Sequence, residues 1–178
     1  EEGNYYKVRT LSFPGEYWVE KKYVSFRNSL EELTKVVVVD RNYQNEGVFE
    51  YLDGKWKLIS YTFATTGIKG KYTFETPLGY FMAIETRDRF LYLDDVTGEI
   101  AGYAPYAIRF SAGGYIHGVP VDFKFREDGS RIDPGMKEYL YTIGTTPRSH
   151  KCVRNFTSHA KFLYDWIEIG KSAVIVIE

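Results

Sequence analysis

Three residues in the second half of the chain have side chains suited to nucleophilic chemistry. The only cysteine among the 178 residues is Cys152; His150 lies two positions before it and His117 lies further upstream. A thiol becomes a useful nucleophile as the thiolate, which a nearby imidazole or a helix N-terminus favours. Because a helix is predicted just after Cys152, its free N–H groups would favour a thiolate and an oxyanion. The alternative is that this cysteine is a small buried hydrophobe.

The three histidines differ in what surrounds them. His117 follows a predicted strand, which suits a rigidly held general base or a hydrogen-bonded structural residue. His150 could donate to a substrate, orient the site or make a structural contact. His159 falls on the second turn of the predicted helix and is expected to be a solvated surface residue. A metal site made of His117, His150 and Cys152 lacks a fourth ligand at a recognisable spacing, so no metal is predicted.

Composition excludes several classes of function. Lys plus Arg number 23 and Asp plus Glu number 24, so the chain has no excess of positive charge with which to bind nucleic acid or an anionic membrane surface. The longest aliphatic run, Val36 to Val39, is far shorter than the roughly 20 apolar residues of a membrane span. A single cysteine excludes an internal disulfide. The sequence begins without Met or an apolar signal segment, so we expect any secretory signal to have been removed already.

The elements that must position these residues are mostly strands. With 16 Tyr, 12 Phe and 3 Trp, the composition is typical of a globular, β-rich protein. Ser29 and Glu32 form a capping-box pattern that predicts one helical turn over Leu30 to Thr34. Asp53-Gly54 predicts a type I′ hairpin turn, because both positions need positive φ. Strands are predicted over Lys35–Asp40, Glu46–Leu52, Lys55–Ala64, Gly79–Arg87, Phe90–Leu93, Tyr106–Phe110, Tyr115–His117 and Ser172–Ile177.

Two segments break this pattern of strands. Val119 to Leu140 is polar and rich in turn residues, which predicts a loop or flap. Thr157 to Ile169 is predicted to be a helix capped by Thr157 or Ser158 and ended by Gly170. Its apolar residues recur at helical spacing, namely Ala160, Leu163, Tyr164 and Ile167. The whole pattern predicts one domain with an all-β sandwich or barrel.

Several motifs resemble those of one known family over roughly residues 35 to 178. Ser149 to Arg154, Ser-His-Lys-Cys-Val-Arg, precedes a helix and a Gly-Lys-Ser-Ala-Val-Ile-Val-Ile strand, and looks like the end of a YkuD-like L,D-transpeptidase catalytic domain. Ile116-His117-Gly118 is similar to that family's His-Gly element. Thr76-Pro77-Leu78-Gly79 resembles its Thr-Pro-x-Gly segment, and Val36 to Gly67 resembles its opening hairpins with a Thr-Gly end.

The resemblance implies a fold and a reaction. The fold would be a mainly β sandwich over residues 35–178 with one helix after the nucleophile. Residues 1–34 would be a lead-in or the end of a truncated upstream region. The reaction would be peptidoglycan L,D-transpeptidation, in which Cys152 attacks the third residue of a stem tetrapeptide and D-Ala leaves. The resulting thioester would pass its acyl group to an amine of a second stem.

The resemblance also assigns roles to residues. His117 would be the general base, oriented by the backbone carbonyl of Gly118. Backbone N–H groups of Lys151 and Cys152 would form the oxyanion hole, with His150 beside them. Arg154 would fix the site or meet a stem carboxylate.

Further candidates for substrate contact are Tyr115 and Ser149. Tyr103, Tyr106 and Tyr115 could stack on sugar or peptide, or could simply pack in the sheet. No cofactor or metal is implied. The implied partners are peptidoglycan stem peptides, with carbapenem-type β-lactams as inhibitors. The implied location is outside the cytoplasm, in the periplasm or cell wall.

Two departures from the family pattern keep other functions open. Lys151 stands where the family usually has Gly, and positive φ there would cost on the order of 1 kcal/mol. The 31 residues between His117 and Ser149 exceed the usual spacing, and the extra length in 119–140 is either a lid or a surface insertion. The alternatives are an L,D-carboxypeptidase with water as acceptor, a non-catalytic cell-wall-binding module and, more distantly, a cytosolic thiol hydrolase.

Overall fold

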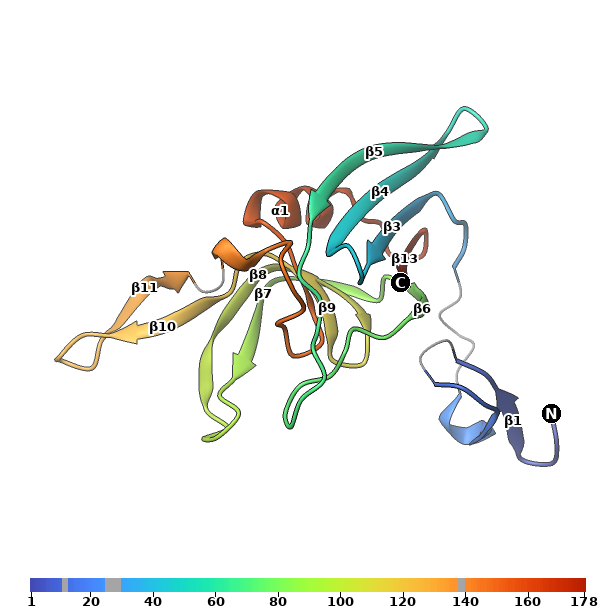
Figure 1. Cartoon of the computed structure of the whole chain (residues 1–178), viewed down its shortest axis with the longest axis horizontal. Helices are drawn as coiled ribbons and strands as arrows, with labels where there is room; N and C mark the ends of the chain where they lie inside the picture. Colours follow the sequence, from blue (N-terminus) through green and yellow to red (C-terminus); the bar gives the residue numbers. More distant parts are fainter. Residues whose placement is uncertain (11–12, 25–29, 138–139) are drawn as a thin grey trace.

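The computed structural model describes residues 1–10, 13–24, 30–137 and 140–178, and it is built mainly from strands (Figure 1). One sheet has the order β5-β4-β3-β13-β6; a second has the order β11-β10-β8-β9-β12, with β7 also paired to β8. A two-stranded sheet, β1-β2, precedes both. The strands are β1 (Tyr5–Val8), β2 (Tyr17–Glu20), β3 (Lys35–Asp40), β4 (Asn45–Leu52), β5 (Lys55–Phe63), β6 (Gly79–Met82), β7 (Glu85–Leu93), β8 (Ile100–Ser111), β9 (Gly114–His117), β10 (Val121–Phe125), β11 (Arg131–Lys137), β12 (Val153–Arg154) and β13 (Ser172–Ile177). The predicted mainly β fold is confirmed.

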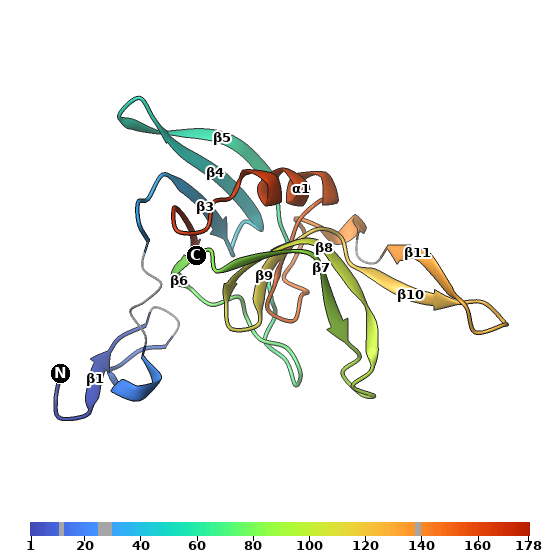
Figure 2. The same cartoon turned by 180° about the vertical axis from the view of Figure 1, so that it is seen from behind.

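The core lies between the two larger sheets and the helix α1 (Thr157–Trp166). Val37 of β3 and Val174 of β13 meet Ile108 of β8 and Leu163 of α1 there, all without solvent exposure. Figure 2 shows α1 beside β8, on the side where the β4–β5 hairpin lies. Burial of these aliphatic side chains is the main favourable contribution to folding.

The two strands predicted from aliphatic runs are confirmed with their bounds. β3 and β13 run parallel and pair along their whole length, from Lys35 with Ser172 to Asp40 with Ile177. The turn at Asp53-Gly54 is also confirmed, because it joins β4 to β5 with φ of 53° and 78°. β4 does not alternate as predicted: its first half is buried and its last residues are exposed. The reason is that the hairpin end extends past β3 (Figure 1).

The single strand predicted over Gly79–Arg87 is two strands in different sheets. β6 pairs with β13, whereas β7 pairs with β8 and includes the predicted Phe90–Leu93 strand. The chain crosses between the sheets at Ala83, whose N–H donates to Ser172, and Ile84, whose N–H donates to Arg109. The two acceptors belong to different sheets, so a local pattern could not show the crossing.

The segment 119–140, predicted to be a loop or flap, contains the hairpin β10–β11. Val121 and Asp122 pair with Tyr103 and Gly102 of β8, so the hairpin begins as part of the sheet. Of the turn residues in this segment, Glu127 to Ser130 lie at the tip, where the Arg126 N–H donates to the Ser130 carbonyl, whereas Asp133-Pro134-Gly135 lies within β11. Beyond the first pairs the hairpin projects away from the body (Figure 1), which explains its polar sequence.

The helix begins at Thr157 as predicted, but its N-cap and its C-terminal end differ from those predicted. Its N-cap is Phe156, without a side-chain cap, because the Thr157 hydroxyl instead accepts the N–H of Val119. It ends at Trp166, whose carbonyl accepts a hydrogen bond from the Lys35 ammonium group at 2.7 Å. Gly170, the predicted end, lies in the following turn with φ of 89°.

The helical turn predicted over Leu30 to Thr34 is absent. Residues 30–34 are not helical, and the N–H groups of Glu31 and Thr34 donate to the carbonyls of Gly170 and Lys171. This pairing with the segment before β13 replaces the local bonds of a turn. Ser29, the predicted cap, lies outside the described residues.

Replacing Leu163 by Ala tests the contact of α1 with the core. Leu163 is fully buried, so we expect Leu163→Ala to lower the free energy of unfolding in urea by about 2–5 kcal/mol. Phe162→Ala is the matched control, because Phe162 is 37% exposed and its loss should cost clearly less. Equal losses for both variants would contradict the placement of the helix.

Candidate active site

The pairing of β9 with β12 brings the cysteine and a histidine to one face of a sheet. These strands run parallel, with Val153 beside Ile116 and Arg154 beside His117. Ile116 and Val153 point into the core cluster and are fully buried. Because side chains alternate along a strand, His117, Arg154 and the preceding Cys152 lie on the opposite face. Residues 117 and 152 are therefore neighbours in space.

A pocket of about 550 Å³ opens on that face. Five of the predicted site residues line it, namely His117, Ser149, His150, Cys152 and Arg154. The remaining lining comes from Phe90–Asp95, Ala101, Gly113, Pro120 and Asp122. The other three predicted site residues, Tyr115, Gly118 and Lys151, are not among the lining residues. A cavity with a thiol, an imidazole and a guanidinium can accommodate a polar acyl substrate.

His117 is buried and held in one orientation. Its Nδ1 lies 2.7 Å from the backbone carbonyl of Gly118, the contact that the resemblance predicted. Since a carbonyl only accepts, Nδ1 carries the hydrogen and Nε2 keeps a free lone pair. Burial lowers the pKa of His117 to about 4, opposed by the Gly118 hydrogen bond and reinforced by the positive charge of Arg154. The imidazole is therefore neutral at neutral pH.

Cys152 is also buried, and burial raises the pKa of its thiol. A backbone hydrogen bond from Tyr115 and the positive charges of Arg154 and Lys151 oppose that rise. The predicted position at the N-terminus of the helix is wrong, because β12 and two further residues separate Cys152 from α1. The resting site thus holds a neutral thiol and a neutral imidazole in one pocket.

The nucleophile loop, residues 149–152, is held through its carbonyl groups. All four accept hydrogen bonds, and three of the donors belong to the segment 66–76. In order along the loop, the donors are the Ile68 N–H at 3.0 Å, the Phe74 N–H at 2.7 Å, the Thr76 hydroxyl at 2.8 Å and the Ser149 hydroxyl. The loop has no regular structure of its own, so these partners satisfy its buried peptide groups.

Two amides of this loop remain available to a ligand. In a trans peptide the N–H points opposite to the preceding carbonyl. Because the carbonyls of His150 and Lys151 point toward segment 66–76, the N–H groups of Lys151 and Cys152 point away from it. Within the described part of the chain, neither amide donates a hydrogen bond.

Thr76 joins two of the motifs singled out from the sequence. Its fully buried hydroxyl accepts the N–H of Gly67 at 2.8 Å and donates to the carbonyl of Lys151 at 2.8 Å. A Cβ on Gly67 would lie 2.3 Å from the Phe74 carbonyl oxygen and 2.8 Å from the Lys151 Cα. The Thr-Gly and Thr-Pro-x-Gly elements therefore act by holding the nucleophile loop.

Lys151 carries no backbone strain. Its φ lies outside the left-handed region, so the expected penalty for a side chain at this position does not arise. The ammonium group donates to the carbonyl of Ala112 at 2.6 Å and ties the loop to the β8–β9 turn. The departure from the family's glycine is compatible with an intact loop.

His150 and Ser149 occupy different environments. His150 is exposed, and its Nε2 lies 2.6 Å from a carboxylate oxygen of Asp95 at the tip of the β7–β8 hairpin. Ser149 is fully buried, with its hydroxyl bound to the carbonyl of Cys152. Asp95 and Asp122, which line the pocket, were missed because nothing in their local sequence marks them.

The tyrosines singled out from the sequence make packing contacts. Tyr115 is buried and its ring stacks on Phe90, with centroids 4.3 Å apart. Tyr103 contacts Phe123 and the Arg89 guanidinium. Tyr106 contacts Tyr164 of α1. All three tyrosines therefore contribute to packing around the sheet.

His159 is not the solvated residue that was predicted. Its side chain is 11% exposed, and Nε2 lies 3.1 Å from the fully buried carboxylate of Glu46. The pair joins α1 to β4, a long-range contact that helical spacing does not reveal. Among the described residues, no group of His, Cys, Asp or Glu is arranged to hold a metal ion. None of the described helices is both long and apolar enough to span a membrane.

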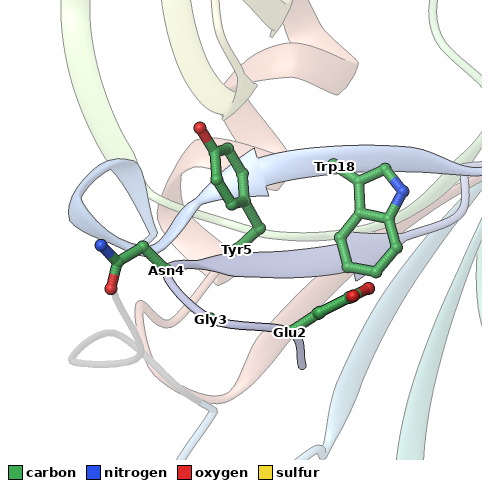
Figure 3. A pocket seen from close by; sticks show the side chains of 5 residues that line it. All are labelled: Glu2, Gly3, Asn4, Tyr5 and Trp18. Carbon is green, nitrogen blue, oxygen red and sulfur yellow. The ribbon is translucent and has the colours of Figure 1, made fainter.

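A second pocket, of about 490 Å³, lies on the β1–β2 sheet (Figure 3). The rings of Tyr5 and Trp18 stand along it, with Glu2 and Asn4 near its ends. It contains neither the thiol nor an imidazole, so it is not the chemical site. The division of the chain at residue 34 stays a prediction.

Comparisons with known proteins concern the family and the fold. Residues 34–176 match the YkuD family, described as the L,D-transpeptidase catalytic domain. No curated protein matches the chain. The fold is similar to an L,D-transpeptidase from Mycobacterium smegmatis at 22% identity, with a TM-score of 0.60 over 82% of this chain and 59% of that one.

Two further solved structures were determined with β-lactams. The LD transpeptidase LdtMt1 in complex with imipenem is 18% identical, with a TM-score of 0.60 over 81% of this chain and 59% of that one. L,D-transpeptidase 3 from Mycobacterium tuberculosis, with a faropenem-derived adduct, is 20% identical, with a TM-score of 0.55 over 82% of this chain and 60% of that one. The chain thus spans about three-fifths of the length of these proteins. At such identities the likeness establishes the fold.

Removing the Thr76 hydroxyl should displace the nucleophile loop. We expect Thr76→Val, which keeps the shape, to destabilise the protein by about 1–3 kcal/mol because it leaves buried partners unpaired. Acylation of Cys152 by a carbapenem, followed by intact mass, should slow at least tenfold. Thr76→Ser retains the hydroxyl and should remain close to wild type. Wild-type acylation in Thr76→Val would show that the loop holds its shape without this bridge.

Proposed function

Since the chain belongs to the YkuD family of L,D-transpeptidase catalytic domains, we propose that it is a peptidoglycan L,D-transpeptidase with Cys152 as its nucleophile. The observation that supports this most is the β9–β12 pairing, which puts Cys152 and His117 on one face beside a pocket. Two amides that have no hydrogen-bond partner among the described residues lie next to the thiol. Thiol, base and oxyanion donors together are the requirements of acyl transfer.

In the acylation step, Sγ of Cys152 attacks the carbonyl carbon of the third residue of a stem tetrapeptide. The thiol proton passes to the free Nε2 of His117. This nitrogen can accept the proton because the imidazole is neutral. The carbonyl oxygen becomes an oxyanion, and the N–H groups of Lys151 and Cys152 donate to it. Arg154, close enough to affect the pKa of both reacting groups, further favours the negative charge.

Collapse of the tetrahedral intermediate breaks the bond between the third residue and D-Ala. His117 returns the proton to the leaving amine, and a thioester on Cys152 remains. An amine of a second stem then attacks the thioester carbonyl and gives its proton to His117. The new amide forms as the C–S bond breaks, and the proton returns to the sulfur. No cofactor takes part in this proposal.

Other predicted site residues would act through these groups. Ser149 is a positioning residue, because its hydroxyl is bound to the carbonyl of Cys152. Gly118 orients the imidazole through its carbonyl, and Tyr115 supports the wall behind the thiol. His150 is exposed at the pocket and paired with Asp95, and it would contact a stem peptide from there. Arg154 lines the pocket and could meet a stem carboxylate.

The proposed substrate would require the protein to act outside the cytoplasm, in the periplasm or cell wall. The wall-binding alternative depends on backbone strain at Lys151, and the ordinary φ of that residue weakens it. The carboxypeptidase alternative shares every step up to the thioester. Product analysis with a tetrapeptide distinguishes the two, since transfer gives a cross-linked dimer and hydrolysis gives a free tripeptide.

Exposure to a carbapenem tests the nucleophile. A carbapenem is a strained acyl donor, so we expect intact-protein mass to show one stable adduct on the wild type and none on Cys152→Ala. The adduct requires both a reactive thiol and an oxyanion hole. A folded wild-type protein that forms no adduct would overturn the enzyme proposal in favour of the wall-binding module.

The pH dependence of acylation tests the state of His117. The neutral imidazole is the active form, and its pKa is lowered to about 4. Protonation therefore removes the base only at low pH. We expect the acylation rate to stay level from about pH 7 to pH 5 and to fall about tenfold per pH unit below pH 4. Circular dichroism at each pH serves as the control for folding. A midpoint near pH 6.5 would contradict a buried, neutral base.

A further inference from the structure

The wall of the pocket formed by β7, β8 and β10 contains a row of three residues from three strands. Tyr92 of β7 is paired with Gly102 of β8, and Gly102 is paired with Asp122 of β10. The Tyr92 hydroxyl passes over the glycine and donates to Oδ1 of Asp122. Both Tyr92 and Asp122 line the pocket that contains Cys152.

This row requires a glycine at position 102. A Cβ at that position would lie 2.4 Å from the Tyr92 hydroxyl oxygen and 2.3 Å from the carbonyl oxygen of Val121. Any larger residue would push the tyrosine away from the carboxylate. The contact is therefore specified by three positions together, one of them on the hairpin that lengthens the chain between His117 and Ser149.

Asp122 differs from the other acidic residues of the pocket. The carboxylate of Asp94 accepts hydrogen bonds from the N–H groups of Val96 and Thr97, at 2.9 and 2.8 Å, within its own turn. Asp95 is paired with the His150 imidazole. The Asp122 carboxylate is held by a neutral hydroxyl and, in the part of the chain that the structure describes, forms no ion pair. It can still bind a cation that enters the pocket.

Resting on the function proposed above, we propose that Asp122 binds the side-chain ammonium group of the third residue of the donor stem. The pocket would then select donors whose third residue is a diamino acid. That residue presents its carbonyl to Cys152, so its side chain extends within the same pocket. A charged hydrogen bond from ammonium to carboxylate gives both affinity and selectivity.

The amine bound at Asp122 is that of the donor for a chemical reason. The acceptor amine must lose a proton before it can attack the thioester. A carboxylate that holds the ammonium form would oppose this loss and slow the transfer. The donor amine does not react, so binding it as a cation lowers KM without interfering with a chemical step.

The experiment compares two synthetic tetrapeptide donors that differ in one group. One has lysine at the third position, and the other has norleucine, which lacks the amine. For the wild type we expect a KM about tenfold lower for the lysine donor, with a similar kcat. Asp122→Asn retains an acceptor for the Tyr92 hydroxyl and removes the charge, so it should treat the two donors alike.

Asp88→Asn is the matched control, because Asp88 is an exposed aspartate of β7 outside the pocket lining. It should keep the wild-type preference for lysine. If Asp122→Asn also keeps that preference, or raises KM for both donors equally, Asp122 is only a clamp for the hairpin and the inference is overturned.

Acylation by a carbapenem separates this inference from the proposed function. A carbapenem has no third-residue side chain, so its adduct with the wild type reports on the thiol and the oxyanion hole alone. If the wild type forms the adduct but does not distinguish the two donors, the role of Asp122 fails and the proposed function stands. If the wild type forms no adduct and releases no D-Ala, the proposed function itself fails.

Discussion

The position of the nucleophile depends on hydrogen bonds to the carbonyl groups of residues 149–152. This loop has no strand or helix of its own, so its shape is fixed from the segment 66–76. That segment is in turn tied to the five-stranded sheet through Gln44, a buried residue next to β4. The side-chain amide of Gln44 donates to the Thr66 hydroxyl and accepts a hydrogen bond from the Thr66 N–H. The Thr66 carbonyl then accepts the N–H of Ser149. A continuous series of hydrogen bonds thus connects one sheet to the thiol that lies beside the other.

Burial determines the electrostatics of the site as well as its rigidity. It lowers the pKa of His117 and raises that of Cys152, so a preformed thiolate–imidazolium pair is disfavoured. Charge then develops only as the substrate carbonyl is attacked. Arg154 acts on both groups in the direction that favours an anion and disfavours a second cation. Its charge is therefore best suited to the moment at which sulfur and the carbonyl oxygen become negative.

Sequence patterns predicted the parts of the fold that local chemistry decides. The aliphatic runs at Lys35–Asp40 and Ser172–Ile177 and the turn at Asp53-Gly54 are all present. The motif spacing also singled out the residues that β9 and β12 bring together. The missed features depend on distant partners: the Thr157 hydroxyl binds Val119 instead of capping its helix, and His159 pairs with a buried carboxylate on β4. Neither partner can be inferred from nearby residues.

The lysine at position 151 shows where the steric constraint of the nucleophile loop lies. The loop approaches the segment 66–76 closely, and a glycine is required at one side of that contact. The required glycine is Gly67, where a Cβ would collide with the Phe74 carbonyl and the Lys151 Cα. Lys151 itself has an ordinary φ, and its side chain leaves the contact toward Ala112. Because Gly67 on the opposite segment provides the space, residue 151 is free to vary, and here it adds a tie to the β8–β9 turn beside the thiol.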